Sequence, residues 1–563
     1  MSKTKLKASI FKAVFVTVML IIYKTFFGNY DVAIGMILAL SCIAFLKFDF
    51  TLYPIYKTAS FICLNLFLLV MSFLSGINPF LGFIINLITI FIVSYSYMDT
   101  SKNMVSYLFT FVYIFMISIP VPYNLLPKRF ISLLFGILVI MVSQFIFNKN
   151  KFKSSCTNLI SNSLNNIIKE INDIIQENTN KKDNILIYDN LRNLLLFINN
   201  KNSHGIFSKG VNEHYFNIAV ILERLADIIK KIDSLDDKSF KTNYLIDLKF
   251  ILSDILKIID NKEFNINHKL LEKYINSEDK HSIIYECNNL IDMLYVNIEK
   301  LDNPSKMIKA DFKKLLLDNI SINFNSLRFN FSIKMALAIS ISMFFIDEFN
   351  LSNGRWLLIT IYVLIQPFNS DTIVKTKKRI KGTLIGVSLF ILIFGIFQPK
   401  IPSIIFILLL MLIYFYATDY YIKVASTCVL ALSINLASNN LQTLSILRFS
   451  FIFIGAIISI LFSKYFLPFS KINHLNELKN RYLLLSSKMV SELNEVLNDK
   501  YDISHLKKLS LDCNTIESTL LSLLKNTDDT KTKKLIYTEY KVISHIRFST
   551  LSFYNDKLKR SLP

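Results

Sequence analysis

The chain has 563 residues and carries 63 Lys and Arg against 42 Asp and Glu, a net charge of +21. Its residues are 52% hydrophobic and 13% aromatic, with a mean hydropathy of +0.43. This composition is too apolar for an ordinary soluble protein and indicates an integral membrane protein. The positive charge does not indicate a nucleic-acid partner, because no nucleic-acid-binding motif accompanies it. Lysines placed near anionic lipid explain it.

Twelve apolar blocks are long enough, at roughly 17–20 residues, to cross a hydrocarbon core of about 30 Å as helices. The first block follows three lysines, as in a signal peptide, but it is too long and lacks a cleavage pattern, so we expect a retained helix. The sequence therefore predicts an all-α polytopic membrane protein. The expected spans are 8–26, 31–47, 58–76, 78–97, 104–121, 129–147, 329–346, 355–369, 382–398, 401–417, 422–437 and 444–467.

Two polar stretches, one before and one after the last six predicted spans, have apolar residues at helical spacing. In the middle stretch this spacing predicts a soluble helical domain with loops near 178–184, 199–212 and 234–240. The tail has the same character, and the two stretches are able to pack together. The predicted parts are a first six-helix repeat (1–147), a cytoplasmic helical domain (148–327), a second six-helix repeat (328–467) and a C-terminal cytoplasmic helical region (468–563).

The two membrane blocks have matching residues at a constant separation. Tyr95 and Tyr97 lie 319 residues before Tyr414 and Tyr416, and the same separation joins Arg129 to Arg448. Six spans per copy is an even number, so the two copies are predicted to be parallel, related by an axis along the membrane normal. Transporters of this type usually keep their path between the halves.

The short loops indicate the orientation of the chain. With the N-terminus inside, the inner loops collect roughly 17 Lys and Arg and the outer loops roughly 5, which predicts cytoplasmic N- and C-termini. The five cations in Lys375–Lys381 are then a cytoplasmic anchor between the eighth and ninth spans. Arg355, Lys400 and Arg448, at the other side, are expected to be interfacial anchors.

Motifs of known enzyme classes are missing from the sequence. It contains no P-loop, nucleophile elbow, zinc-protease or dinucleotide-binding pattern. All seven histidines fall in the polar regions, and the six cysteines are scattered without metal-ligand spacing. We therefore expect a protein that is not an enzyme and that has no cofactor and no bound metal.

Cations and amides at the ends of the eighth and ninth spans are the candidate substrate pathway. Glycines and a threonine begin the predicted ninth span directly after Arg379 and Lys381, and a positive helix N-terminus at that place suits an anion. A role of the cations in topology alone is the alternative. The candidate residues are Arg355, Trp356, Gln366, Asn369, Arg379, Lys381, Gly382, Thr383 and Gly386.

Four tyrosines near the span ends suit either of two roles. Tyr95, Tyr97, Tyr414 and Tyr416 are expected in an aromatic belt at the interface or as stacking surfaces for an aromatic substrate.

The stretch from Trp356 to Gly386 resembles a known family. Its Gln366-Pro367 pair and the motif Arg379-Ile-Lys-Gly-Thr-Leu-Ile-Gly386 are similar to the signature of the fusaric-acid-resistance (FUSC) and aromatic acid exporter proteins. The resemblance implies a bacterial inner-membrane protein with two six-helix blocks and a cytoplasmic helical region. In the first copy the motif is degraded, with Lys57-Thr-Ala-Ser in its place.

The family resemblance implies efflux of organic anions, aromatic carboxylates in particular. Plant malate channels are similar at a greater distance, which keeps a passive anion channel open as an alternative. A membrane-anchored scaffold for envelope assembly is a third hypothesis. The expected partners are a small organic anion and the lipid bilayer, with no nucleic acid, and a homo-oligomer is compatible with the sequence.

Overall fold

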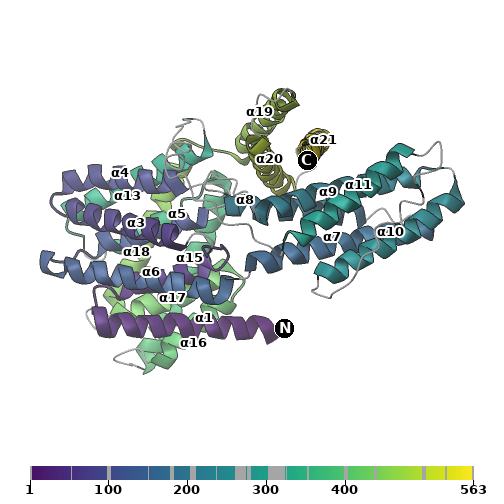
Figure 1. The fold of residues 1–563 in the computed structure, drawn as a ribbon. Helices are drawn as coiled ribbons and strands as arrows, with labels where there is room; N and C mark the ends of the chain where they lie inside the picture. The colour runs from purple at the N-terminus through teal and green to yellow at the C-terminus, as the bar shows by residue number, and fades with distance from the viewer. Residues whose placement is uncertain are drawn as a thin grey trace. The chain divides into compact units, whose positions relative to one another are not determined.

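The computed structural model of the chain is helical, and no strand occurs among the residues that it describes (Figure 1). An all-α protein is therefore confirmed. The described residues are 3–51, 54–97, 103–149, 151–177, 183–202, 211–235, 237–259, 281–301, 326–351, 354–397, 404–435, 441–497, 503–525 and 529–560, with the single positions 274 and 324.

The chain folds into two compact units, and each unit combines two separate stretches of sequence. The membrane unit consists of Met1–Lys149 and Ser321–His474, and it holds the apolar helices. The helical unit consists of Asn150–Ile320 and Leu475–Pro563. The middle and C-terminal polar stretches therefore form one body.

A helix occurs at each of the twelve predicted spans. Among the described residues, seven helical segments are long and apolar enough to cross a membrane, and five further apolar helices are shorter, at 10–17 residues. The first half contains α1 (Lys3–Ile22), the π-helical turn η1 (Tyr23–Phe27), α2 (Val32–Phe45), α3 (Pro54–Ser75), α4 (Pro79–Tyr97), α5 (Asn103–Ser118), the 3₁₀ turn η2 (Tyr123–Leu125) and α6 (Leu126–Asn148). The second half contains α13 (Leu327–Glu348), α14 (Arg355–Leu364), α15 (Asn369–Phe397), α16 (Ile404–Tyr416), α17 (Tyr420–Asn435) and α18 (Leu441–Tyr465).

The packing of the two halves repeats. In each half the second helix packs on the sixth, and the third helix packs on the fifth and the sixth. Between the halves, the first helix of each packs on the fourth helix of the other, α1 on α16 and α13 on α4. Two parallel copies related by an axis along the membrane normal produce this reciprocal packing.

The membrane unit has an apolar interior and an apolar exterior. Buried Phe, Ile, Leu and Met side chains from both halves form one continuous core. Many large apolar side chains on the outer faces are exposed, as expected for helices that contact lipid. α13 is an interior helix, because 67% of its most apolar 18-residue stretch is buried. For α1 with η1 the buried share is 28%.

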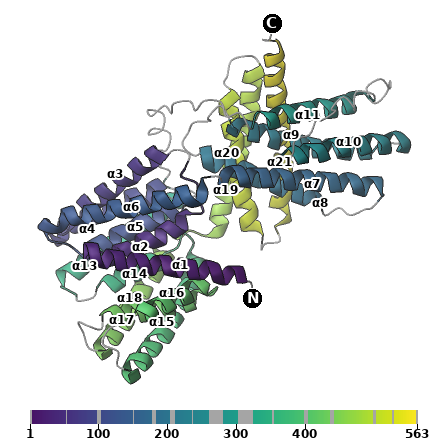
Figure 2. The same cartoon turned by 60° about the horizontal axis from the view of Figure 1, so that its bottom comes forward.

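The helical unit is a bundle of amphipathic helices. Figure 2 shows α7, α9, α10 and α11 alongside one another. Its helices are α7 (Lys151–Ile175), α8 (Asp183–Asn202), α9 (Val211–Asp233), α10 (Lys238–Ile259), α11 (His281–Glu299), α19 (Lys471–Leu497), α20 (Ile503–Leu524) and α21 (Thr530–Arg560). Part of each predicted loop, residues 178–182, 203–210 and 236, lies outside the described residues.

Buried ion pairs join the two stretches of the helical unit. Arg547 on α21 donates to Glu223 on α9 at 3.3 Å, and Arg192 on α8 donates to Glu517 on α20 at 2.6 Å. Leu551 of α21 also lies in the core formed by α7–α11. Apolar burial and charge pairing therefore both connect the C-terminal helices to the middle stretch.

Candidate anion-binding site

The ninth span begins earlier than the sequence predicts. α15 runs without a break from Asn369 to Phe397, so Gly382 lies in the middle of a helix and offers no free backbone N–H groups. The predicted helix N-terminus beside Arg379 and Lys381 is therefore wrong. Nothing between Asn369 and Lys381 breaks a helix, since this stretch contains neither glycine nor proline.

The turn between α14 and α15 is fixed by the amides predicted there. α14 ends at Leu364, and the Gln366 side chain donates to the Ile365 carbonyl at 2.8 Å. The Gln366 backbone N–H donates to Thr372 Oγ1 at 3.0 Å. Ser463 of α18 donates to Asn369 Oδ1 at 3.2 Å. Gln366 and Asn369 therefore position the start of α15 against the end of α18.

Small residues in the motif allow α15 to pack tightly on α17. A Cβ atom at Gly382 would lie 2.4 Å from the Tyr421 carbonyl oxygen, and one at Gly386 would lie 2.7 Å from Cys428 Cβ. Thr383, fully buried, donates its hydroxyl to the Arg379 carbonyl at 2.9 Å. Close helix contact, the other role expected of these glycines, is what the structure shows.

The cations of Lys375–Lys381 point in different directions because they lie on a helix. Arg379 is buried, with 7% of its surface exposed. Its Nη1 donates to the Tyr420 hydroxyl at 3.5 Å, and its Nε has no hydrogen-bond partner. Lys381 is exposed, and its ammonium lies 4.7 Å from the centre of the Tyr421 ring. The structure thus brings Arg379, and not Lys381, into the interior.

Tyrosines from both halves surround the inner end of this site. The ammonium of Lys375 lies 5.9 Å from the Tyr107 ring and 5.7 Å from the Tyr420 ring. Tyr107 of α5 stacks on Tyr362 of α14 with ring centres 4.7 Å apart, and the Tyr362 hydroxyl donates to the Tyr107 carbonyl. Tyr414 lies close enough to Arg379 for electrostatic interaction. Cations and aromatic rings therefore meet where the two halves touch.

Arg448 lies deeper in the same half. Only 6% of it is exposed, its guanidinium lies 4.7 Å from the ring centre of Trp356, and its Nε has no hydrogen-bond partner. Its guanidinium also interacts with the thiol of Cys428, and it interacts electrostatically with Arg379 and Arg355, which are both cations. The expectation that Arg448 is an interfacial anchor is therefore wrong. Trp356 is buried beside it, with 3% of its surface exposed.

Helix geometry places these cations at successive depths. α15 and α18 pack antiparallel, because the start of one meets the end of the other at Asn369 and Ser463. At 1.5 Å per residue, Arg379 lies about 15 Å beyond Asn369, and Arg448 about 22 Å from Ser463. Arg448 is thus about 7 Å deeper than Arg379, and Arg355 begins α14 at the other end of the half.

The matching arginine of the first half has a different environment. Arg129 on α6 is 1% exposed, and its Nε donates to Asp31 Oδ1 at 2.9 Å. Its Nη1 also donates to the Ile119 carbonyl at 2.7 Å. Asp31 directly precedes α2, whereas Gly354 precedes the corresponding α14. One copy therefore neutralises its buried arginine with a carboxylate, whereas the other has none beside its arginine in the part of the chain that the structure describes.

The other predicted tyrosines contact different cations. The Arg328 guanidinium lies 4.2 Å from the Tyr95 ring, and the Lys5 ammonium lies 5.2 Å from the Tyr416 ring. The Tyr97 side chain lies outside the described residues. Of the four tyrosines, the structure brings Tyr414 to the arginines.

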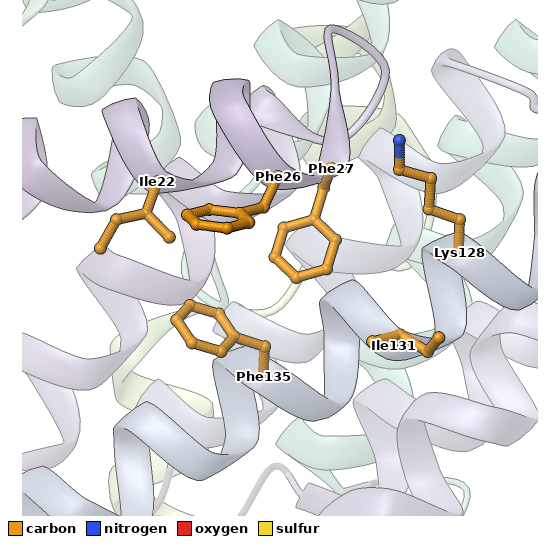
Figure 3. Close-up of a pocket in the computed structure, with 6 residues that line it drawn as sticks. All are labelled: Ile22, Phe26, Phe27, Lys128, Ile131 and Phe135. Atoms are coloured by element: carbon orange, nitrogen blue, oxygen red, sulfur yellow. The ribbon is translucent and has the colours of Figure 1, made fainter.

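Two apolar hollows of the membrane unit do not contain these arginines. One, of about 540 Å³, lies in the first half, where Figure 3 shows Phe26, Phe27 and Phe135 near one another with Lys128 to one side. The other, of about 230 Å³, lies between α15, α16 and α17. Both are lined mainly by apolar side chains, and neither lies between the two halves.

Several site residues were missed by the sequence interpretation. Arg448, Tyr420, Tyr107 and Tyr362 join predicted residues only through contacts between distant helices. A usable signal for Arg448 was its 319-residue separation from Arg129, combined with its place inside the predicted span. Lys334 of α13, also missed, is fully buried and its Nζ has no hydrogen-bond partner.

Comparison with known proteins bears on this half of the membrane unit. Residues 338–462, under a quarter of the chain, match the family described as fusaric acid resistance protein-like. This segment is similar to that family of membrane proteins. It extends from α13 to α18 and includes Trp356, Arg379 and Arg448. The match confirms the resemblance predicted from the motif and supports a transport or efflux-related function in a membrane. No curated protein and no solved structure matches the chain.

Proposed function

We propose that the protein is a bacterial inner-membrane transporter that exports organic carboxylate anions, aromatic ones among them, with both chain termini in the cytoplasm. The family match supports membrane transport. The distribution of Lys and Arg in the short loops supports the orientation.

The guanidinium groups of Arg379 and Arg448, which have no carboxylate partner among the described residues, carry the proposal. Burying an unpaired charge among membrane helices costs several kcal/mol of free energy. Contact with an aromatic ring such as Trp356 offsets only about 2 kcal/mol of this cost. Arg379 and Arg448 each keep a buried Nε without a partner. A carboxylate is the natural complement of such a group, since a guanidinium binds it through two parallel hydrogen bonds.

The surroundings of Arg379 favour an aromatic substrate. Tyr107, Tyr414 and Tyr420 lie around Lys375 and Arg379. A ring that stacks on tyrosine while its carboxylate meets a cation uses both features. Successive cations then lead such an anion from Arg379 to Arg448 and on to Arg355.

Transport into everted membrane vesicles tests this function directly, with radiolabelled benzoate as the probe. We expect Arg379→Gln and Arg448→Gln each to lower the apparent benzoate affinity about tenfold to a hundredfold, because each removes a charge-assisted hydrogen bond. Lys464→Gln, an exposed lysine on α18, is the matched control and should transport normally. Normal transport by both arginine variants, at normal protein levels, would contradict the proposal.

A passive anion path is the second candidate, because no carboxylate contacts Arg379 or Arg448 among the described residues. A coupled pump usually holds a titratable carboxylate along its path. Currents in planar bilayers separate the two cases. An anion current that reverses at the anion equilibrium potential and ignores an imposed proton gradient indicates a channel, whereas benzoate accumulation driven by the proton gradient indicates an exporter.

A further inference from the structure

The hollow between α15, α16 and α17 is a second surface with a defined chemistry. Its walls are apolar, and it is open on the outer side of the bundle, where Ile385 and Leu389 of α15 and Leu409 of α16 are exposed. Figure 2 shows these three helices grouped together. An apolar groove on the outside of a membrane helix bundle is open to lipid chains.

Two lysines lie at one end of this groove on the same face of α15. Lys378, Lys381, Ile385, Leu389 and Ile393 follow one another at spacings of three and four residues, and such residues share a helix face. Both lysines are exposed. The Lys381 ammonium lies over the ring of Tyr421, which itself lines the groove. The cationic end and the apolar groove are therefore continuous.

The described residues do not neutralise the charge at this end of the groove. Among the described residues, no carboxylate forms an ion pair with Lys378 or Lys381, and Asp419, in the turn before α17, pairs with neither. The groove contributes only apolar walls apart from Tyr421 and Ser426. A ligand that fits must therefore combine a negative group with a long apolar part.

The depth of the groove fits one lipid leaflet. From Lys381 to Ile393 the helix rises about 18 Å, and half of a hydrocarbon core of about 30 Å is about 15 Å. We propose that this groove binds one anionic phospholipid, with the acyl chain between α15, α16 and α17 and the phosphate on Lys378 and Lys381. Basic pockets at the ends of membrane helices recognise such headgroups.

This site assigns Lys381 a role separate from transport. Arg379 points into the bundle and Lys381 points outward, because two residues along a helix lie on nearly opposite faces. The lipid site does not depend on the proposed transport, and each can fail without the other.

Native mass spectrometry of the full chain in detergent, titrated with phosphatidylglycerol and phosphatidylcholine of equal chain length, tests the lipid site. We expect one phosphatidylglycerol to bind tightly to each chain. Each lysine near the surface should contribute about fivefold to the affinity. Lys378→Gln with Lys381→Gln should therefore weaken phosphatidylglycerol binding about 25-fold, to the level of phosphatidylcholine. Both lysines are exposed, so the variant should fold normally.

Two further variants separate this groove from general attraction of lipid to a basic surface. Leu389→Trp fills the groove without removing charge and should displace the tightly bound lipid. Lys464→Gln removes one exposed lysine of α18, outside the groove, and should leave binding unchanged, as should Arg379→Gln inside the bundle. The proposal is overturned if the double lysine variant keeps full phosphatidylglycerol affinity, or if Lys464→Gln weakens binding as much as Lys381→Gln does.

Discussion

Arg129 and Arg448 occupy matching positions in the two copies, so replacing each with methionine is a controlled comparison. Arg129→Met leaves Asp31, which is 3% exposed, without its partner at 2.9 Å. Removing one member of a buried ion pair typically costs 3–5 kcal/mol, because the other charge stays buried. We expect this loss in the free energy of unfolding, and we expect Arg129→Met with Asp31→Leu to recover most of it.

Arg448→Met should behave in the opposite way. Arg448 has no carboxylate partner among the described residues, and its contacts include the Trp356 ring at 4.7 Å and the thiol of Cys428. The variant loses a cation–π contact of about 2 kcal/mol and removes an uncompensated buried charge of similar or larger cost. The free energy of unfolding should change by less than about 1 kcal/mol, whereas benzoate transport should fall strongly.

Steric-trap unfolding in mixed micelles measures the first quantity, and transport into everted vesicles measures the second. The expected pattern is a stability loss with Arg129→Met and a transport loss with Arg448→Met. If Arg448→Met loses as much stability as Arg129→Met, then Arg448 has a buried structural role, and the argument that assigns it to an anion is refuted.

Three shorter predictions concern other parts of the chain. Gly382→Ala places a methyl group 2.4 Å from a backbone carbonyl and should cost about 1–3 kcal/mol of stability, whereas Gly395→Ala, with no atom within 4 Å, should be neutral or stabilising in the same unfolding assay. Burial raises the pKa of Cys513 to about 12, so at pH 8 about one in 10,000 of its thiols is ionised, and maleimide should label it only after unfolding. Arg547→Met leaves Glu223 buried and unpaired and should make α21 susceptible to limited proteolysis, in contrast to Lys534→Met at an exposed position.

The membrane helices could be predicted because their signal is local. A run of apolar residues long enough to cross a bilayer can be recognised from its own sequence, without knowledge of the helices that pack against it. Each of the twelve predicted spans contains a helix in the structure. The start of α15 was misplaced because Gly382 and Thr383 resemble a helix boundary in sequence. The structure continues the helix through them because α17 packs against that face, with the Tyr421 carbonyl at contact distance.

The candidate site was only partly predictable because its contacts are not local. Arg379 and Lys381 are two residues apart in the sequence and were expected to act together. Because α15 already begins at Asn369, both lie within a helix, and their side chains are on nearly opposite faces. Arg448 lies just inside a predicted span, where long cations often extend to the interface. Its burial under Trp356 depends on the packing of α14 against α18, which no single segment specifies.

The difference between the two copies bears on the substrate. In the first half, Asp31 at the start of α2 supplies a carboxylate to Arg129. In the second half, the residue at the start of α14 is Gly354, which has no side chain to supply one. On the proposed function, the substrate carboxylate occupies in the second half the place that Asp31 occupies in the first. On this proposal, the Asp31–Arg129 pair identifies a carboxylate as the chemical group that Arg448 accepts.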